Sequence, residues 1–395
     1  MKFTSTLAED IRPEAELLLC CASTHVDSER AKRITSLVQE GMNWSYLTWK
    51  AFQHGMMPLL YSHLNALCPE AVPPVVMYRL RGHFNNNARL NLLLMGELLN
   101  VLNTLSTHEI SAIPYKGPVL AASVYGNLAL RESGDLDIVV NEEDVLKTKE
   151  LLLSRGYRPI RQAGRGQETV LPLCQYPLHR DDSGVNLDIH WRLTPRYLTF
   201  PLDFQQLYGR LEPMSIGGQE IRTLAPEDLL LILCIHGSKH LWEQLRWICD
   251  VTELIRVHQD MDWGRVMEQA EHLGCERMLF LGLLLARDLL GAAIPDMILE
   301  KLRTDSVVRS LAVEARALLF SGTDLRFRRI ISHLRMVKRL RDMARYCLYR
   351  VPSMGMVTGF CYSPLALSFT NHLLRPVRSF SHTWGKVVDS EVCDV

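Results

Sequence analysis

The stretch Arg131-Glu-Ser-Gly-Asp135-Leu-Asp137-Ile-Val-Val140 sets two acidic residues two positions apart at the start of an apolar run. The apolar, β-branched flank favours a strand, and on a strand both carboxylates leave the same face. Two ionised carboxylates held that close repel each other unless a cation offsets the repulsion. Oxygen ligands suit a hard cation such as Mg²⁺ or Mn²⁺ better than zinc. The stretch therefore predicts a strand that carries a divalent-metal site.

A third acidic residue, Asp188, lies in the alternating segment 185–191, Val-Asn-Leu-Asp-Ile-His-Trp. Its apolar neighbours point to the other face of the strand, so Asp188 can approach the same metal from a neighbouring strand. A three-carboxylate, two-metal site activates an attacking oxygen and stabilises the leaving oxygen of a phosphate. Phosphoryl or nucleotidyl transfer is the chemistry that such a site serves.

These residues carry a family resemblance. Gly117, the Gly-Asp-Leu-Asp at 134–137 and the isolated Asp188 resemble, in order and spacing, the signature of the DNA polymerase beta-like nucleotidyltransferase superfamily. More narrowly, the chain from about residue 10 to residue 380 is similar to an uncharacterised bacterial nucleotidyltransferase family. The segments that carry this closer likeness are Tyr115-Lys-Gly-Pro-Val-Leu-Ala, Val-Tyr125-Gly, Arg131, the acidic strand, Ile-His190-Trp-Arg and His236-Gly-Ser-Lys-His240-Leu-Trp.

The resemblance implies a metal-dependent enzyme that moves an NMP from an NTP, ATP first among them, to an acceptor hydroxyl or phosphate and releases pyrophosphate. The candidate site residues fall into three groups, of which the resemblance implies the first. The metal-binding and catalytic residues are Asp135, Asp137 and Asp188, with Mg²⁺ or Mn²⁺ as cofactor and Asp188 also able to take the acceptor proton. The nucleotide-binding residues are Lys116, Gly117, Arg131 and Gly134. The residues for the acceptor, or for orienting other groups, are His190, His236, Lys239, His240 and Asp250.

The sequence departs from the superfamily at one position. Pro118 follows Gly117 where the superfamily usually has serine or glycine, and proline offers no backbone N–H to a phosphate. Donor recognition therefore depends more on Lys116 or Arg131. Simpler roles stay open: Lys116 can be a solvated residue beside a turn, and Arg131 can pair with Glu132 or with a metal-site carboxylate. His190 can be a catalytic base or can orient a metal-binding carboxylate.

The hydrophobic pattern predicts an α+β fold, with a small mixed β-sheet as the nucleotidyltransferase core, a helical N-terminal lead-in and a mostly α-helical C-terminal domain. Expected strands cover residues 110–115, 135–140, 167–173, 175–179 and 185–191, with a hairpin turn at 181–184. Expected helices cover 15–21, 44–67, 75–105, 118–125 and 142–155, the last capped by Asn141 and ended by Gly156. The expected domains are 1–108 helical, 109–225 catalytic, 226–378 helical and 379–395 a flexible tail.

Residues 226–257 predict one long helix, which starts at Pro226 and carries polar residues at steps of four, three, four and three. That stripe consists of His236, His240, Glu243, Trp247 and Asp250. It can line a pocket in which a histidine or Lys239 meets the nucleotide or the acceptor. Equally, it can be a polar seam in which Asp250 orients a neighbouring arginine or histidine. A zinc pair formed by the two histidines is the third alternative, without a third ligand at a telling distance.

Residues 326–350 carry nine Lys or Arg against one acid, Asp342, interleaved with apolar residues. This pattern predicts a basic amphipathic helix, which can contact lipid at most peripherally, grip the acceptor, or simply be solvated. Across 395 residues the formal net charge is zero, which argues against a protein that coats nucleic acid. Ten scattered cysteines and a polar N-terminus favour the cytoplasm, and no membrane span is expected.

The acceptor stays open, with weak preference for a small molecule or a biosynthetic intermediate. Two other functions compete with transfer. One is a non-catalytic module on the same scaffold that senses a nucleotide or docks a partner. The other is a phosphodiester hydrolase, which would use the same metal site with water as the acceptor.

Overall fold

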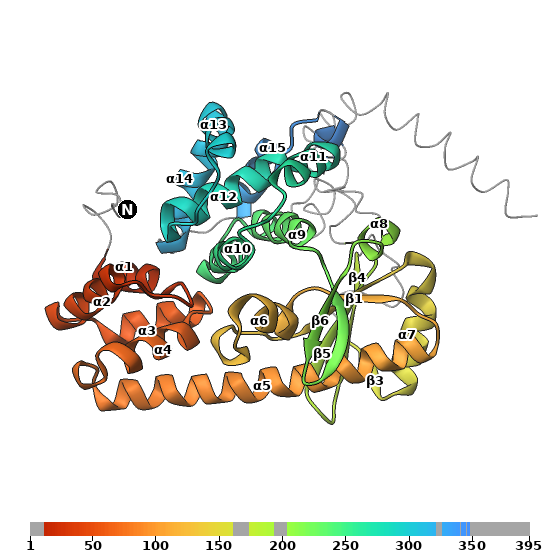
Figure 1. Ribbon diagram of the computed structural model, residues 1–395, viewed down its shortest axis with the longest axis horizontal. Coiled ribbons are helices and arrows are strands. Elements are labelled where there is room, and N and C mark those ends of the chain that lie inside the picture. The colour runs from red at the N-terminus through yellow and green to blue at the C-terminus, as the bar shows by residue number, and fades with distance from the viewer. Residues whose placement is uncertain are drawn as a thin grey trace, which may run out of the picture. The chain divides into compact units, whose positions relative to one another are not determined.

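The computed structural model describes residues 12–160, 174–192, 204–320, 326–339, 341–344 and 346–347. The chain divides into two compact units, residues 1–343 and 344–395. Every element labelled in Figure 1 belongs to the first unit. The expected α+β class is confirmed, because helices surround a five-stranded mixed sheet. The expected domain boundaries at residues 108, 225 and 378 stay predictions.

The five-stranded sheet has the order β1-β2-β5-β4-β3. Its strands are β1 (Ala112–Pro114), β2 (Leu136–Val140), β3 (Tyr157–Pro159), β4 (Gln175–Arg180) and β5 (Val185–His190). β2 and β5 are parallel, and the other neighbours are antiparallel. The expected β4–β5 hairpin forms with Gly184 at a φ of +68° in its turn, whereas β3 was not expected and the strand expected at 167–173 lies outside the described residues.

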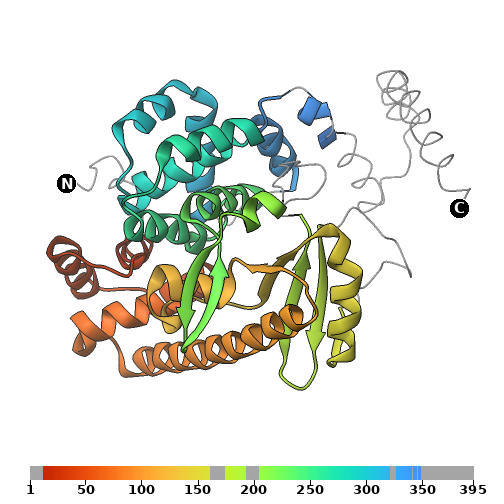
Figure 2. The ribbon, with the colours of Figure 1, turned by 45° about the vertical axis from the view of Figure 1, so that its right-hand side comes forward.

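The two faces of the sheet differ because side chains alternate along each strand. Leu136, Ile138 and Val140 of β2 join one hydrophobic core with Leu94 and Leu98 of the long helix α5 (Pro74–Thr107). Figures 1 and 2 show α5 running beside the sheet. The opposite face carries the polar residues of the strands. Burial of the apolar face on α5 thus fixes which way the acidic residues point.

The N-terminal helices are α1 (Pro13–Cys21), α2 (Ser28–Glu40), α3 (Trp44–Gln53), α4 (Met57–Leu67) and the 3₁₀ turn η1 (Pro69–Ala71). The single helix expected over 44–67 is wrong, since α3 ends before Gly55, which has a φ of +66°. Glycine adopts this left-handed conformation without a Cβ penalty and ends helices there. The apolar spacing continues across the break, so periodicity alone did not reveal it.

Short elements connect the strands: α6 (Gly117–Tyr125), η2 (Leu128–Leu130), η3 (Glu142–Asp144) and α7 (Val145–Ser154). The helix expected over 142–155 starts as the 3₁₀ turn η3, and Asn141 precedes it without a capping hydrogen bond from its side chain. The expected cap is therefore wrong. Gly156, at a φ of +92°, follows the end of α7 as expected.

After the sheet, the chain forms α8 (Phe204–Tyr208) and a two-stranded sheet, β6 (Glu212–Ile216) and β7 (Gln219–Thr223). Helices follow: α9 (Pro226–Lys239), α10 (Leu245–Val257), α11 (Trp263–Leu273), α12 (Glu276–Leu290), α13 (Asp296–Thr304), α14 (Ser306–Phe320) and α15 (Arg326–Met336). The single helix expected over 226–257 is wrong, because α9 and α10 meet at a corner. Leu241 and Trp242 in this corner have φ values of +54° and +56°.

The corner is held by Trp242, whose side chain is completely buried. Its ring lies against two glycines: a Cβ on Gly237 would come within 2.5 Å of it, and a Cβ on Gly282 within 3.0 Å. The amide of Trp242 also donates to the Gly237 carbonyl at 2.8 Å. Burial of the Trp242 indole against these two glycines offsets the backbone strain of Leu241 and Trp242, which both have a positive φ.

The basic segment is not one continuous helix, because α15 ends at Met336 and residues 337–339 are not helical. Several of its described cations bind within the protein: Arg335 pairs with Glu314, Lys338 pairs with Glu276, and Arg339 donates to backbone carbonyls of α11. None of the described helices combines the length and the apolar character that crossing a bilayer requires. Peripheral lipid contact through residues 326–350 stays a prediction.

Candidate functional site

A cavity of about 420 Å³ lies between the polar face of the sheet and the corner of α9 and α10. It gathers the predicted site residues from both halves of the chain. Those on the sheet side are Lys116, Gly117, Arg131, Gly134, Asp135, Asp137, Asp188 and His190; those on the helical side are His236, Lys239 and His240. Only Asp250 of the predicted set is absent from the lining of this cavity.

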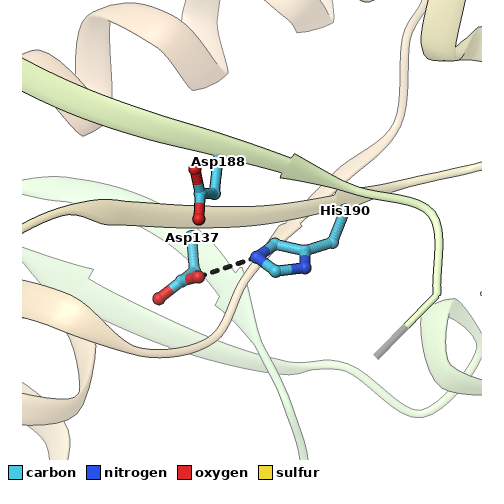
Figure 3. A group of neighbouring side chains, drawn as sticks. All are labelled: Asp137, Asp188 and His190. Atoms are coloured by element: carbon cyan, nitrogen blue, oxygen red, sulfur yellow. Dashed lines mark hydrogen bonds and ion pairs between the residues drawn. The ribbon is translucent and has the colours of Figure 1, made fainter. Parts of the chain in front are cut away.

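Asp137 and Asp188 lie side by side at the centre of the sheet side, because they are register partners on the parallel strands β2 and β5. His190 Nε2 bonds Asp137 Oδ1 at 2.8 Å, as Figure 3 shows, and Gln175 Nε2 donates to Asp188 Oδ2 at 2.6 Å. One ligand atom from each of Asp137, Asp188 and His190 lies within 4.8 Å of the other two. Among the described residues, these three form a group that is able to hold a metal ion.

Asp135 lines the same cavity just before β2 begins, although it is not one of that group of three. Its backbone carbonyl closely approaches Gly117, which has a φ of +56°. A Cβ on Gly117 would lie 2.8 Å from the Asp135 carbonyl oxygen. Only glycine fits this contact, so Gly117 lets the turn before α6 lie directly against the acidic strand.

The two central carboxylates are electrostatically unequal. Burial, together with the charges of Asp137 and Asp135, raises the pKa of Asp188 to about 6. Burial opposes ionisation of Asp137 as well, but the Lys116 charge and the His190 hydrogen bond hold the pKa of Asp137 below its ordinary value. Asp137 is therefore a permanent anion, whereas Asp188 can exchange a proton near neutral pH.

The helical side presents the cations Lys239 and Arg246 and the imidazole of His236, which Lys116 contacts from the sheet side. Lys116 Nζ donates to His236 Nδ1 at 3.2 Å, and burial together with the Lys116 charge depresses the pKa of His236 far below its ordinary value. His236 is thus a neutral acceptor. Burial and the Lys116 charge also lower the pKa of Lys239. Arg246 Nη1 donates to the Glu132 carbonyl at 3.0 Å, which brings a further cation to the cavity.

Three aromatic rings cluster on this helical side. The ring centres of His236 and His240 lie 4.8 Å apart, and those of His240 and Trp247 lie 5.1 Å apart. His236 also meets Trp247 edge-on at 5.4 Å. The rings are tilted or edge-on to one another, so they line this side of the cavity with aromatic surface without forming a single plane.

Arg131, which lines the cavity, forms a buried ion pair with Asp250, which does not. Arg131 Nε and Nη2 donate to the two carboxylate oxygens of Asp250 at 2.7 and 2.9 Å, and the Tyr125 hydroxyl donates to Asp250 at 2.7 Å. Arg131 Nη1 lies 3.4 Å from the Gly117 carbonyl and 3.3 Å from the Glu132 carbonyl. The guanidinium thus joins the turn before α6 to the loop before β2, and Asp250 orients it.

Sequence reasoning missed Gln175, Arg246 and Trp247 as parts of the lining. The signal for Gln175 was present, because hairpin pairing places it opposite His190. Trp247 belonged to the predicted stripe but was not assigned to the site. Arg246 lies beside the sheet only because the chain turns at the corner between α9 and α10, and no local sequence pattern predicts this corner.

The donor set fits a divalent cation. Carboxylate oxygens supply the charge, and the imidazole of His190, which is 5% exposed, supplies a nitrogen. Burial and the Asp137 charge also raise the pKa of Asp135, so the ionised carboxylates in this cavity repel each other. A bound cation would relieve this repulsion.

A sequence profile of a family described as uncharacterised nucleotidyltransferase matches residues 40–291. No curated protein is significantly similar to the chain. Among solved structures, the chain is similar to the crystal structure of an antigenic nucleotidyltransferase-like protein from Paracoccidioides brasiliensis. The identity is 14%, the match covers 55% of this chain and 96% of that chain, and the TM-score is 0.30.

Proposed function

Since the chain belongs to the uncharacterised nucleotidyltransferase family, whose profile spans most of its length, we propose that it transfers an NMP from an NTP to an acceptor. ATP is the donor that we test first. The observation that carries the proposal is the paired carboxylates Asp137 and Asp188, which line one cavity together with the cations Lys116, Lys239 and Arg246. Carboxylates that hold a metal and cations that hold phosphates are the two parts that phosphoryl transfer requires.

The acidic residues Asp135, Asp137 and Asp188 would hold Mg²⁺ or Mn²⁺, in the two-metal arrangement that the family resemblance implies. When bound, these ions polarise the α-phosphate and neutralise the triphosphate. The side chains of the protein position the substrate. Lys116 and Lys239 bind the phosphates. The guanidinium of Arg131 is bonded to Asp250 and holds in place the two loops that carry Gly117 and Asp135.

In the transfer step, an acceptor oxygen forms a bond to the α-phosphorus as the bond from that phosphorus to the bridging oxygen breaks. Pyrophosphate leaves with the bonding electron pair. When the acceptor is a hydroxyl, its proton passes to the carboxylate of Asp188, which lies in the same cavity. An acceptor phosphate attacks without this proton transfer.

A small molecule or a biosynthetic intermediate is the acceptor that we favour, in line with the family resemblance. The cavity, which must also hold the NTP, has a volume of about 420 Å³, in the usual range for small-molecule pockets. The zero net charge of the chain supports the absence of a stable nucleic-acid complex.

The test incubates each α-labelled NTP with the protein, a cell extract and Mg²⁺ or Mn²⁺, and looks for a labelled product and pyrophosphate. Replacement of Asp137 by Asn should lower the transfer rate by about 10³-fold, because it removes a metal-binding charge without changing the shape. Asp260→Asn, a change at an exposed position outside the cavity, is the matched control and should leave the rate unchanged.

Two outcomes would replace the proposal by one of its competitors. Labelled NMP alone, with no labelled acceptor, would identify a hydrolase. Tight binding of a non-hydrolysable ATP analogue without metal, with no turnover of any NTP, would identify a sensing or docking module. An Asp137→Asn protein that folds and transfers NMP at the wild-type rate would contradict the site itself.

A further inference from the structure

The Asp137–Asp188 pair has a different candidate ligand on each side. Asp135 lies two residues before Asp137, just ahead of β2, and His190 lies two residues after Asp188 at the end of β5. Because β2 and β5 are parallel with Asp137 opposite Asp188, Asp135 and His190 lie on opposite sides of the pair along the strands. The pair thus has a carboxylate on one side and an imidazole on the other.

The imidazole is held in place. His190 is 5% exposed, and Tyr115 packs edge-on against its ring with the ring centres 5.5 Å apart. Gln175 Nε2 donates a hydrogen bond to Oδ2 of Asp188, and Oδ1 of Asp188 takes no part in this bond. Figure 3 shows the two carboxylates and the ring of His190 gathered at the same point of the sheet.

The spacing of these atoms suits one coordination sphere. With metal–ligand distances of about 2.1 Å, adjacent ligand atoms lie about 3 Å apart and opposite ones about 4 Å apart. His190 Nε2 and Asp137 Oδ1 are 2.8 Å apart, and all three ligand atoms lie within 4.8 Å of one another. Small side-chain movements would therefore bring the three onto a common ion.

We propose that His190 Nε2 is itself a metal ligand and forms, with Asp137 and Asp188, a mixed nitrogen–oxygen site for a first-row transition-metal ion such as Mn²⁺. An imidazole nitrogen favours transition metals, whereas Mg²⁺ prefers oxygen ligands alone. The meaning of this site for catalysis rests on the proposed function, but binding of the ion does not. The simpler role, in which His190 only orients Asp137 by a hydrogen bond, is the one that the experiment must exclude.

Proton balance allows the ligand role. In the metal-free protein an Nε2–H of His190 donates to Asp137. An ion at Nε2 would need the lone pair of this nitrogen, with the ring proton on Nδ1. Nδ1 is buried and has no hydrogen-bond partner among the described residues, so no other group fixes the tautomer.

The test binds Mn²⁺ to the full-length protein without NTP and measures pulsed electron paramagnetic resonance. We expect a ¹⁴N coupling to the manganese that His190→Gln removes, with Mn²⁺ affinity lowered by about tenfold or more and Mg²⁺ affinity lowered less. His272→Gln, at an exposed position on α11, is the matched control and should keep the coupling. His190→Asn serves as the second variant if the first fails to fold.

Bound Mn²⁺ without ¹⁴N coupling in the wild-type protein would overturn the proposal, as would a coupling that persists in both His190 variants. Absence of Mn²⁺ binding would overturn it as well. Because this measurement needs no NTP, a failure of nucleotidyl transfer would leave its result intact, and the two failures can be told apart.

Discussion

The cavity has two walls, and different structural features position the side chains on each. The sheet wall consists of Asp135, Asp137, Asp188 and His190 on β2 and β5, and the helical wall consists of His236, Lys239, His240, Arg246 and Trp247 on α9, α10 and the corner between them. On the sheet wall, alternation and strand pairing place the carboxylates. On the helical wall, the side chains meet because the chain turns sharply at Leu241 and Trp242.

The difference shows that the same sequence spacing can have two structural causes. On one straight helix, the stripe from His236 to Asp250 would stretch over about 21 Å. In the structure the corner folds this stripe, so that the rings of His236, His240 and Trp247 lie 4.8 to 5.4 Å apart. A compact wall arises where the sequence predicted an extended one.

The largest effect is expected where the two walls are joined. Replacement of Asp250 on α10 by Asn should lower the free energy of unfolding by about 3–5 kcal/mol, because it leaves the buried Arg131 guanidinium without its counter-charge. Urea unfolding measures this loss. The matched control is Tyr125→Phe, which removes one hydrogen bond to Asp250 and should cost only about 1 kcal/mol.

A double variant, Arg131→Met with Asp250→Leu, sharpens this comparison. It should recover most of the lost stability, since apolar residues replace both charges, yet NMP transfer should stay low because the contacts from Arg131 to the Gly117 and Glu132 carbonyls are gone. Full recovery of transfer would show that the pair does not position the site.

An intermediate effect is expected on the helical wall. Lys239→Met should raise the KM for the NTP by about 10- to 100-fold with a smaller change in kcat, because it removes a phosphate contact that is present before and during the reaction. Steady-state kinetics separate the two constants, and Lys301→Met, at an exposed position on α13, is the control. A loss confined to kcat would place Lys239 among the groups that act only in the transition state.

The smallest effect concerns the pH dependence of the sheet wall. The pKa of Asp188 rises from 3.8 to about 6 on folding, so its ionised form destabilises the metal-free protein above pH 6 and this cost vanishes as the pH falls below 4. Asp188→Asn should therefore stabilise the metal-free protein by about 1–2 kcal/mol at pH 7.5. At pH 4 the difference should be small. Urea unfolding in EDTA at both values measures it, and equal destabilisation at both would contradict the assigned cause.

Much of the sheet wall could be predicted. The alternation around Asp137 and Asp188 gave both strands and the face that the acids share, because the apolar partners must be buried on α5. The breaks at Gly55 and at the α9–α10 corner could not be predicted, since the helical periodicity runs through both. The Arg131–Asp250 pair was one of several alternatives that only coordinates could separate.

By itself the sequence determined the two strands that carry Asp137 and Asp188, the acidic face and the family resemblance, because those depend on a period of two and on short motifs. Only the tertiary structure decided that Trp242 folds the helical wall over the carboxylates, that Asp250 holds Arg131, and that His190 lies beside Asp137. The physical reason is the distance along the sequence over which each interaction acts. Alternation is set by neighbours along the chain, whereas the packing of one indole against Gly237 and Gly282 depends on residues far apart in the sequence.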